Sequence, residues 1–231
     1  MTRRAALLLL FASAGCDWLG GADDDSRFPP ADRPVSDIVA SQFSDEETRD
    51  SQNEAERVME MAEIAPGMTV ADIGAGNGYY TIRLAPRVGE DGRVLAQDII
   101  PATRDRLAER VTRERLDNVS VRLGEPADPM LPGDSFDRIF MVHMYHEIES
   151  PYEFLWNMRP ALRADGLVIV VDADRPTNRH GTPPDLLRCE FRAVGYTEVA
   201  YRAMPEIGGY FAAFRKQGAR PEPEDIVPCG Q

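Results

Sequence analysis

The sequence predicts an α/β fold with a mostly parallel sheet and helices on both of its faces. Short apolar, strand-like runs alternate along the chain with amphipathic patterns of helical spacing, as a parallel sheet requires. The stretch VADIGAGNGYYT, residues 70–81, contains a strand, a glycine-rich turn and the start of a helix. Such turns bring the backbone close to a bound nucleotide, because glycine carries no Cβ and tolerates positive φ. We therefore expect a nucleotide-type cofactor site at this turn.

The other elements follow in a regular series. A helix is predicted over residues 45–64, where apolar side chains recur on one face before Pro66-Gly67. Further strands are expected at 93–98, 119–123, 136–142 and 166–172, and further helices at 103–116, 152–162 and 184–194. The run GLVIVVD at 166–172 is apolar enough for a strand that is buried on both faces. Two final strands, 199–204 and 210–215, flank a turn at Gly208-Gly209.

Length and charge limit the possible functions. The chain has 231 residues, enough for one domain with additional segments, and 39 acidic against 26 basic residues give a net charge of −13. Nucleic acid is therefore not expected as the main partner, since binding phosphates requires clustered Lys and Arg.

The first 16 residues form a secretory signal. Arg3 and Arg4 precede a short apolar run that ends in Ser13-Ala14-Gly15-Cys16. This ending resembles a bacterial lipoprotein signal, in which the cysteine is lipidated, although Ser13 stands where that family usually has Leu. The resemblance implies a membrane-anchored protein that faces the periplasm. Two alternatives are an ordinary cleaved signal and a cytoplasmic protein with a mis-assigned start codon.

The remaining chain divides into three parts. Residues 17–44 are acidic and contain several prolines, which predicts a tether. The folded domain is expected over residues 45–216, and residues 217–231 form a Pro-rich tail. Cys189 and Cys229 could pair in an oxidising compartment or remain two thiols, and the sequence leaves both possibilities open.

The glycine turn carries a specific spacing. Gly74, Gly76 and Gly78 form GxGxG with Asp72 two residues ahead, which differs from the GxGxxG of nicotinamide-binding folds. The second strand ends in Asp98, which is placed to accept hydrogen bonds from both ribose hydroxyls of an adenosine. After the third strand, an acid in the segment GEPAD could receive the adenine amino group.

The chain resembles the class I S-adenosylmethionine-dependent methyltransferases in five blocks that occur in the family's order. These blocks are VADIGAGNGYYT, VLAQDI, GEPADPMLPGDSFDRIF, VHMYHEI and LRADGLVIVVDADRP. The resemblance is greatest to the small-molecule subfamily with a YHE-like element after strand four. It implies a Rossmann-like seven-stranded sheet whose last strand is antiparallel, with S-adenosyl-L-methionine across the carboxyl ends of strands one to four. The domain over residues 45–216 would then be a methyltransferase domain.

The resemblance also implies roles for individual residues. The cofactor-binding positions are Asp72, Gly74, Ala75, Gly76, Gly78, Asp98, Ile99, Asp128 and Val142. Gly74, Ala75 and Gly76 would pack under the methionine part, and Asp72 would order their loop. Asp98 would bind the ribose, Ile99 would lie against adenine, and Asp128 would face its N6, with Glu125 as a competitor. Backbone groups at Val142 and His143 would meet the amino group of the cofactor.

The segment after strand four carries the catalytic candidates. His146 could act as a general base, because histidine side chains ordinarily exchange protons near neutral pH, or it could only position groups of the pocket. His143 is a second candidate. No metal is expected, because His143 and His146 with Glu147 lack a further clear ligand. Asp172 and Asp174 are interpreted as strand-end and turn residues.

The expected function is methyl transfer from S-adenosyl-L-methionine to a small-molecule acceptor. An alternative is a catalytically inactive S-adenosylmethionine-binding module anchored at a membrane. A nicotinamide-dependent oxidoreductase is disfavoured by the glycine spacing. The signal places the domain outside the cytosol, where S-adenosylmethionine is made, and this conflict keeps the inactive module under consideration. The intact glycines, Asp72 and Asp98 favour a working site.

Overall fold

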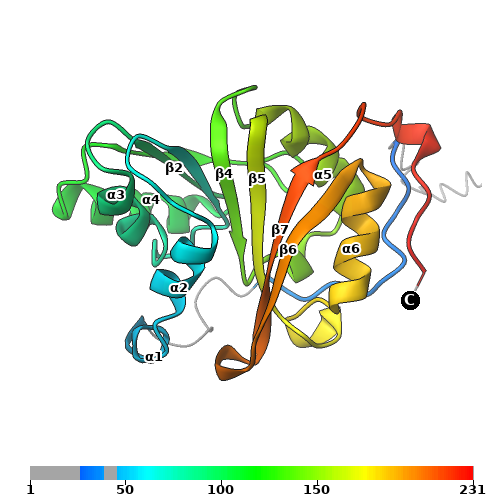
Figure 1. The fold of residues 1–231 in the computed structure, drawn as a ribbon, viewed down its shortest axis with the longest axis horizontal. Helices are drawn as coiled ribbons and strands as arrows, with labels where there is room; N and C mark the ends of the chain where they lie inside the picture. Colours follow the sequence, from blue (N-terminus) through cyan, green and yellow to red (C-terminus); the bar gives the residue numbers. More distant parts are fainter. Residues whose placement is uncertain (1–26, 39–45, 231) are drawn as a thin grey trace, which may run out of the picture.

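The computed structural model describes residues 27–38 and 46–230. Its centre is a seven-stranded sheet of order β3-β2-β1-β4-β5-β7-β6 (Figure 1). The strands are β1 (Thr69–Ile73), β2 (Arg93–Asp98), β3 (Val119–Leu123), β4 (Phe136–Val142), β5 (Leu162–Ala173), β6 (Tyr196–Met204) and β7 (Gly209–Lys216). β7 runs antiparallel to both of its neighbours, and the pairs among β1 to β5 are parallel. The predicted α/β fold, with its last strand antiparallel, is confirmed.

Helices cover both faces of the sheet (Figure 1). They are α1 (Glu46–Ser51), α2 (Glu54–Met61), α3 (Thr81–Val88), α4 (Pro101–Arg113), α5 (Pro151–Met158) and α6 (Pro184–Ala193). The buried side chains of α2 and α3 pack on one face with Phe140 and Ile169, and α5 and α6 pack on the other face with Ile139 and Val168. These alternating residues of β4 and β5 explain why both strands are apolar throughout.

Two predicted boundaries are wrong for local reasons. The expected helix over 45–64 is divided into α1 and α2, because Asn53 between them takes a left-handed conformation with φ 52°. The expected helix over 152–162 ends at Met158, and β5 already begins at Leu162 instead of 166. Pro160 follows this end, and its ring and missing N–H disfavour continuation of the helix.

The segment of residues 27–38, which we call the strap, packs on the domain beside α6. Arg33 forms an ion pair with Glu190 of α6 at 2.8 Å, and both side chains are buried. The Ser36 amide donates to the carbonyl of His146 at 3.2 Å. Part of the predicted tether therefore contacts the domain, while Cys16 and the rest of the signal lie outside the described residues.

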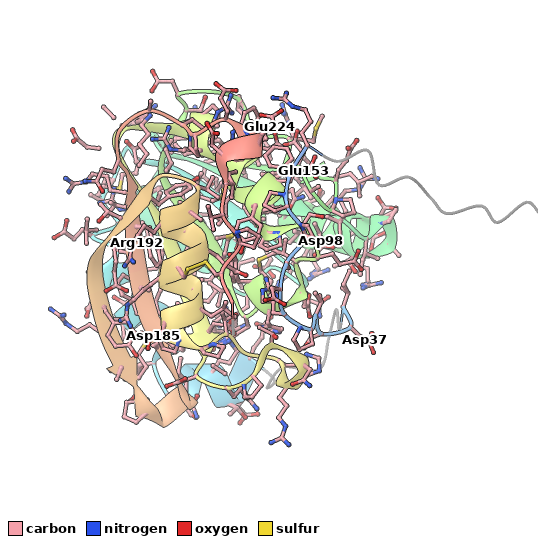
Figure 2. All side chains as sticks on the ribbon, turned by 90° about the vertical axis from the view of Figure 1, so that its right-hand side faces the viewer. Asp37, Asp98, Glu153, Asp185, Arg192 and Glu224 are labelled. Atoms are coloured by element: carbon pink, nitrogen blue, oxygen red, sulfur yellow. A yellow bond between two sulfur atoms is a disulfide. The ribbon has the colours of Figure 1, made fainter. Side chains whose placement is uncertain are left out.

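The C-terminal tail also packs beside α6. Cys229 of the tail forms a disulfide with Cys189 of α6 (Figure 2), so the pairing that the sequence left open is present. The blue strap and the red tail run side by side in Figure 1. Arg27 of the strap donates a hydrogen bond to Glu224 of the tail at 2.9 Å. Within the described ranges, we find no helix with the length and apolar character that crossing a membrane requires.

Candidate functional site

The glycine loop follows the carboxyl end of β1. Gly74, Gly76 and Gly78 have φ values of 65°, 56° and 88°, in the left-handed region that favours glycine. Neighbouring β2 holds the loop, because the Ala75 amide donates to the carbonyl of Gln97 at 2.9 Å. The Gly76 amide donates to Oδ2 of Asp98 at 3.0 Å. The sequence signal thus corresponds to a turn that is fixed to two parallel strands.

The three glycines are required for different reasons. A Cβ added to Gly78 would lie 2.5 Å from Leu107 of α4, and one added to Gly74 would lie 3.0 Å from the Met144 side chain. A Cβ added to Gly76 would meet no atom within 4 Å, so this glycine faces open space. Gly76 is therefore the position where the loop can approach a ligand, and this fits the predicted methionine cradle. Gly78 allows the loop to pack under α4.

Asp72 lies at the junction of strand and loop, as expected. Its carboxylate accepts a hydrogen bond from the Thr81 hydroxyl at 2.6 Å, which joins the end of β1 to the start of α3. Burial raises the pKa of Asp72 to about 6, although the hydrogen bond from Thr81 opposes this shift. Asp72 therefore orders the loop, although removing its carboxylate from water costs free energy.

Asp98 ends β2 next to the glycine loop. Its Oδ1 accepts from the Ile100 amide at 2.9 Å, and its Oδ2 accepts from Gly76. A carboxylate oxygen can accept more than one hydrogen bond, so these contacts orient the group without using its full capacity. The geometry agrees with the predicted ribose-binding position, whose role stays a prediction.

The predicted adenine end is formed by the segment after β3. Oδ1 of Asp128 accepts from the Met130 amide at 2.8 Å, and the backbones of Asp128 and Glu125 form an isolated β-bridge. Asp128 and Ile99 are half-buried, whereas Glu125 is exposed. Of the two acids, Asp128 is therefore the one whose side chain the fold holds in place.

Gln97 contacts the glycine loop, and sequence reasoning did not single it out. Its side chain is 1% exposed, and its Oε1 accepts from the Gly74 amide at 3.4 Å. A Cβ on Gly124 would lie 1.4 Å from the Gln97 amide nitrogen, so only glycine leaves room for this side chain. Gly124 directly follows a predicted strand, and this was the available signal for a close approach at that position.

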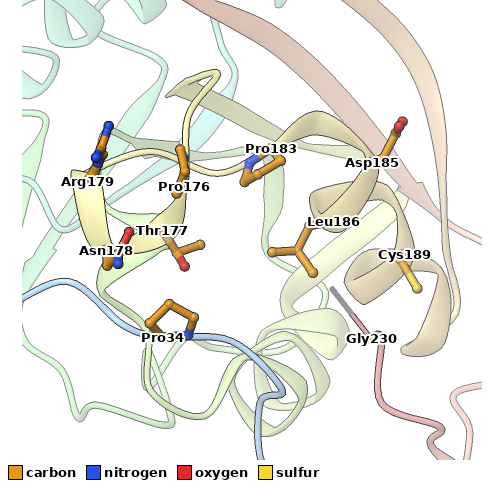
Figure 3. A pocket seen from close by; sticks show the side chains of 10 residues that line it. All are labelled: Pro34, Pro176, Thr177, Asn178, Arg179, Pro183, Asp185, Leu186, Cys189 and Gly230. Carbon is orange, nitrogen blue, oxygen red and sulfur yellow. The ribbon is translucent and has the colours of Figure 1, made fainter.

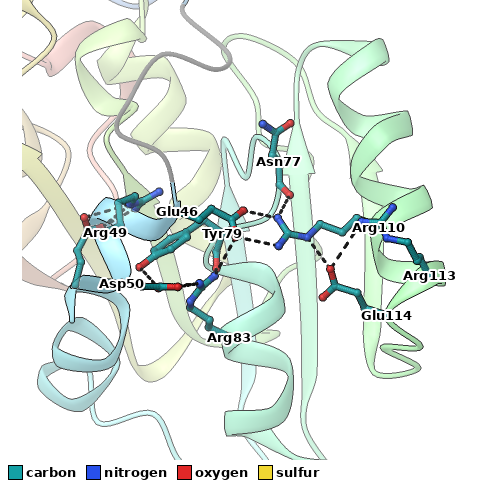
Figure 4. A network of polar contacts seen from close by, with 10 residues as sticks. Glu46, Arg49, Asp50, Asn77, Tyr79, Arg83, Arg110, Arg113 and Glu114 are labelled. Carbon is teal, nitrogen blue, oxygen red and sulfur yellow. Dashed lines mark hydrogen bonds and ion pairs between the residues drawn. The ribbon is translucent and has the colours of Figure 1, made fainter. Parts of the chain in front are cut away.

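Polar side chains of α1, among them Arg49 and Asp50, lie next to the end of the glycine loop (Figure 4). The ring of Tyr79 lies between two guanidinium groups, with Arg49 at 3.7 Å and Arg83 at 3.9 Å from its centroid. The Tyr79 hydroxyl donates to Asp50 at 2.9 Å. These contacts join α1 to α3, and they depend on residues far apart in sequence, for which the sequence held no local signal.

Glu54 connects the Arg49 side chain to His143. Glu54 is buried, and its Oε1 lies 2.6 Å from a guanidinium nitrogen of Arg49, 3.0 Å from the Tyr80 hydroxyl and 3.6 Å from Nε2 of His143. Burial raises the pKa of Glu54, but hydrogen bonds and charge from His143 and Arg49 outweigh burial and lower it to about 2. Glu54 is thus a carboxylate anchored beside the end of β4.

The two histidines after β4 have different surroundings. His143 has φ 54°, and its amide donates a hydrogen bond to the carbonyl of Val171 at 2.8 Å. Its side chain is 11% exposed, and the preceding residue, Val142, is half-buried. His146 is fully buried, with Nδ1 3.0 Å from Oδ1 of Asp172. The strand-end interpretation of Asp172 was therefore incomplete, since this residue orients His146. Asp174 is exposed, as a turn residue should be.

A pocket opens elsewhere, between the strap and the segment that leads into α6 (Figure 3). Its volume is about 740 Å³, and Pro34, Pro176, Pro183 and Leu186 contribute to its lining. None of the predicted site residues lines it. The predicted cofactor site lies instead at the carboxyl ends of the strands, where ligands bind in open α/β sheets.

The central part of the chain is similar to known methyltransferase domains. Residues 70–166 match the methyltransferase domain family. Nocamycin O-methyltransferase of Saccharothrix syringae is 42% identical over 84 residues, 36% of this chain and 30% of that protein. Arsenite methyltransferase of Halobacterium salinarum is 29% identical over 132 residues, 55% of this chain and 34% of that protein. The chain thus spans about a third of the length of these curated relatives.

Solved structures share the fold. An S-adenosylmethionine-dependent methyltransferase from Aquifex aeolicus superimposes with a TM-score of 0.65 at 22% identity, over 75% of this chain and 98% of that one. Together with the family match, these relatives imply S-adenosyl-L-methionine as the cofactor. They support a methyltransferase in the broad sense and leave the acceptor unspecified.

Proposed function

We propose that the protein transfers a methyl group from S-adenosyl-L-methionine to a small-molecule acceptor. One observation carries the proposal: the Gly76 backbone faces open space and is tied to Asp98, the acid at the end of the neighbouring strand. This pairs a backbone cradle with a ribose-binding carboxylate at the carboxyl edge of the sheet. The named activities of the relatives, on nocamycin and arsenite, support a small acceptor.

When bound, the cofactor would supply an electrophilic methyl group on its sulfonium. The task of the chain is then to hold the ligand, align the acceptor and exclude water. The glycine loop would support the methionine part, Asp98 the ribose, and Ile99 and Asp128 the adenine. Backbone groups at Val142 and His143 would meet the amino group.

The acceptor would lie near the residues after β4. We assign the acceptor-facing role to His143, whose ring is partly exposed and contacts the Glu54 carboxylate. For His146 the sequence left open a base or a positioning role. Full burial and the hydrogen bond to Asp172 favour positioning, because a base must reach the proton that it removes.

Calorimetric titration of the full chain with S-adenosylhomocysteine, the demethylated product, tests the cofactor-binding part of this function, which an inactive binding module would share. We expect binding, and a loss of at least about tenfold in affinity in Asp98→Ala from the lost charged hydrogen bonds. Asp105→Ala, which removes an exposed carboxylate on α4, is the matched control and should bind as the wild type does. Absence of binding by the folded wild type would overturn the proposal, and unchanged affinity of Asp98→Ala would remove the ribose assignment.

We also propose that the protein is a periplasm-facing lipoprotein anchored through Cys16. The Cys189–Cys229 disulfide supports this location, because disulfides persist in oxidising compartments. Fractionation of cells that express the full chain should place it with the membrane, and Cys16→Ala should release it. Recovery of the wild type in the cytosol would contradict the location and leave the methyltransferase proposal standing.

A further inference from the structure

Three side chains of the types that bind metals lie close together where the turn after β4 meets the segment after β5. The ligand atoms of His146, Glu147 and His180 all lie within 4.8 Å of one another. His146 and Glu147 belong to the turn η1 (Tyr145–Glu147), and His180 follows the turn η3 (Thr177–Arg179) after β5. From the sequence, His143, His146 and Glu147 had no clear further ligand beside them. The fold brings His180 to this place from a distant segment. His143 does not belong to the group, because it contacts Glu54.

The His146 ring is oriented by a carboxylate. Nδ1 lies 3.0 Å from Oδ1 of Asp172, so Nε2 lies on the other side of the ring. Asp172 is itself fixed, because it accepts from the Thr182 hydroxyl at 2.7 Å and from the Ala173 amide at 2.8 Å. A carboxylate behind the imidazole sets the ring orientation and raises the basicity of the coordinating nitrogen.

The strap holds the two ligand-bearing turns together. The Ser36 hydroxyl donates to the carbonyl of Thr177 and accepts from the His180 amide at 3.1 Å, and the Ser36 amide donates to the carbonyl of His146. His180 has φ 54°, a conformation that a residue other than glycine adopts at a cost. Hydrogen bonds from the strap therefore fix the backbone of the two segments that carry His146 and His180.

We propose that His146, Glu147 and His180 bind a divalent transition-metal ion of the zinc type. Two imidazoles and one carboxylate are a donor set that Zn²⁺ accepts, with a fourth position left for water or another ligand. Tetrahedral ligands of zinc lie about 3.4 Å apart, from metal–ligand distances of 2.0–2.1 Å. Glu147 and His180 are half-buried, and the ligand atoms of the three residues already lie within 4.8 Å of one another.

The test measures zinc directly on the full chain, purified without a polyhistidine tag and stripped with a chelator under non-reducing conditions. Competition with a chromophoric chelator should show one equivalent of Zn²⁺ bound. His180→Ala and Glu147→Gln should each weaken the affinity at least about tenfold. Asp174→Asn is the matched control, because Asp174 is an exposed carboxylate in the segment between β5 and His180. This variant should bind zinc as the wild type does.

The experiment separates this inference from the proposed function. Zinc-edge X-ray absorption of the loaded wild type should show nitrogen and oxygen neighbours at about 2.0–2.1 Å and no sulfur. Titration of the same variants with S-adenosylhomocysteine should give wild-type affinity. Absence of stoichiometric zinc binding, or binding equal in all variants, would overturn the metal site even if S-adenosylhomocysteine binds normally.

Discussion

Nδ1 of His146 lies 3.0 Å from Oδ1 of Asp172, and neither side chain is exposed to solvent. Asp172 also accepts hydrogen bonds from Thr182 and Ala173. Asp172→Ala would leave these buried donors without their acceptor, and we expect a loss of about 3–5 kcal/mol in the free energy of unfolding. Asp174→Ala removes an exposed carboxylate two residues later and should stay within about 0.5 kcal/mol. Urea unfolding of both variants measures the difference, and equal stabilities would show that the buried pair contributes nothing.

Gly76 should be sensitive to substitution in binding more than in folding. Gly76→Val places a side chain in the open space that we assign to the cofactor, so S-adenosylhomocysteine binding should be lost. Gly218→Val is a matched control, since Gly218 has φ 64° and equally open surroundings in the tail. Both variants should show a similar decrease in Tm from the strained φ, and only Gly76→Val should lose binding in calorimetry. Retained binding in that variant means that the ligand does not approach the loop.

The buried carboxyl of Asp72 predicts a pH dependence of stability. Its pKa is about 6 in the folded protein against an ordinary value of 3.8, so the unfolded chain releases the proton first as pH rises. As pH rises from 3.8 to about 6, ionisation of Asp72 should therefore progressively lower the free energy of unfolding. Above about pH 6 the loss should reach its full size of about 3 kcal/mol.

Asp72→Asn keeps an acceptor for the Thr81 hydroxyl and removes the ionisation. We expect this variant to be more stable than the wild type at pH 7, and the two to converge near pH 4. Chemical unfolding at both pH values checks the sign. A variant that is less stable at pH 7 would show that the carboxylate is stabilised in the folded state.

The disulfide should hold the tail on α6. Its cysteines are 40 positions apart, for which loop-closure entropy in the unfolded chain predicts a contribution of about 4 kcal/mol. Reduction with dithiothreitol should lower the denaturant midpoint of the wild type. The double variant Cys189→Ser/Cys229→Ser should start at the lower midpoint and not respond to reductant. A wild-type midpoint that does not change on reduction would argue that the bond adds no stability.

The sequence predicted the parts of the site that lie close together along the chain. Gly74, Gly76 and Asp98 fall within one strand–turn–helix–strand unit, so their spacing alone indicates that they meet. Asp98 was placed correctly beside the glycine loop because parallel neighbours bring their carboxyl ends to the same edge of a sheet.

Contacts between distant segments were not predictable in this way. Asp172 was recognised as a strand end, but its side chain direction toward His146 depends on β4 and β5 being neighbours. His180 reaches His146, and Arg49 reaches Tyr79 and Glu54, from segments whose own pattern shows only a loop and a helix. Gln97 looked like an ordinary polar residue of a strand, and only its fit over Gly124 reveals its role.

The contacts of the strap limit the order in which parts of the chain can fold. Arg33 meets Glu190 over a separation of 157 positions, and Ser36 meets Thr177 over 141 positions. The segment that is synthesised early must therefore stay undocked until the end of β5 and α6 have formed, since closing such long loops precedes any gain from the contacts. Docking of the strap is then a late event of folding, and the two turns that carry His146 and His180 reach their final arrangement only when the first described residues of the chain dock.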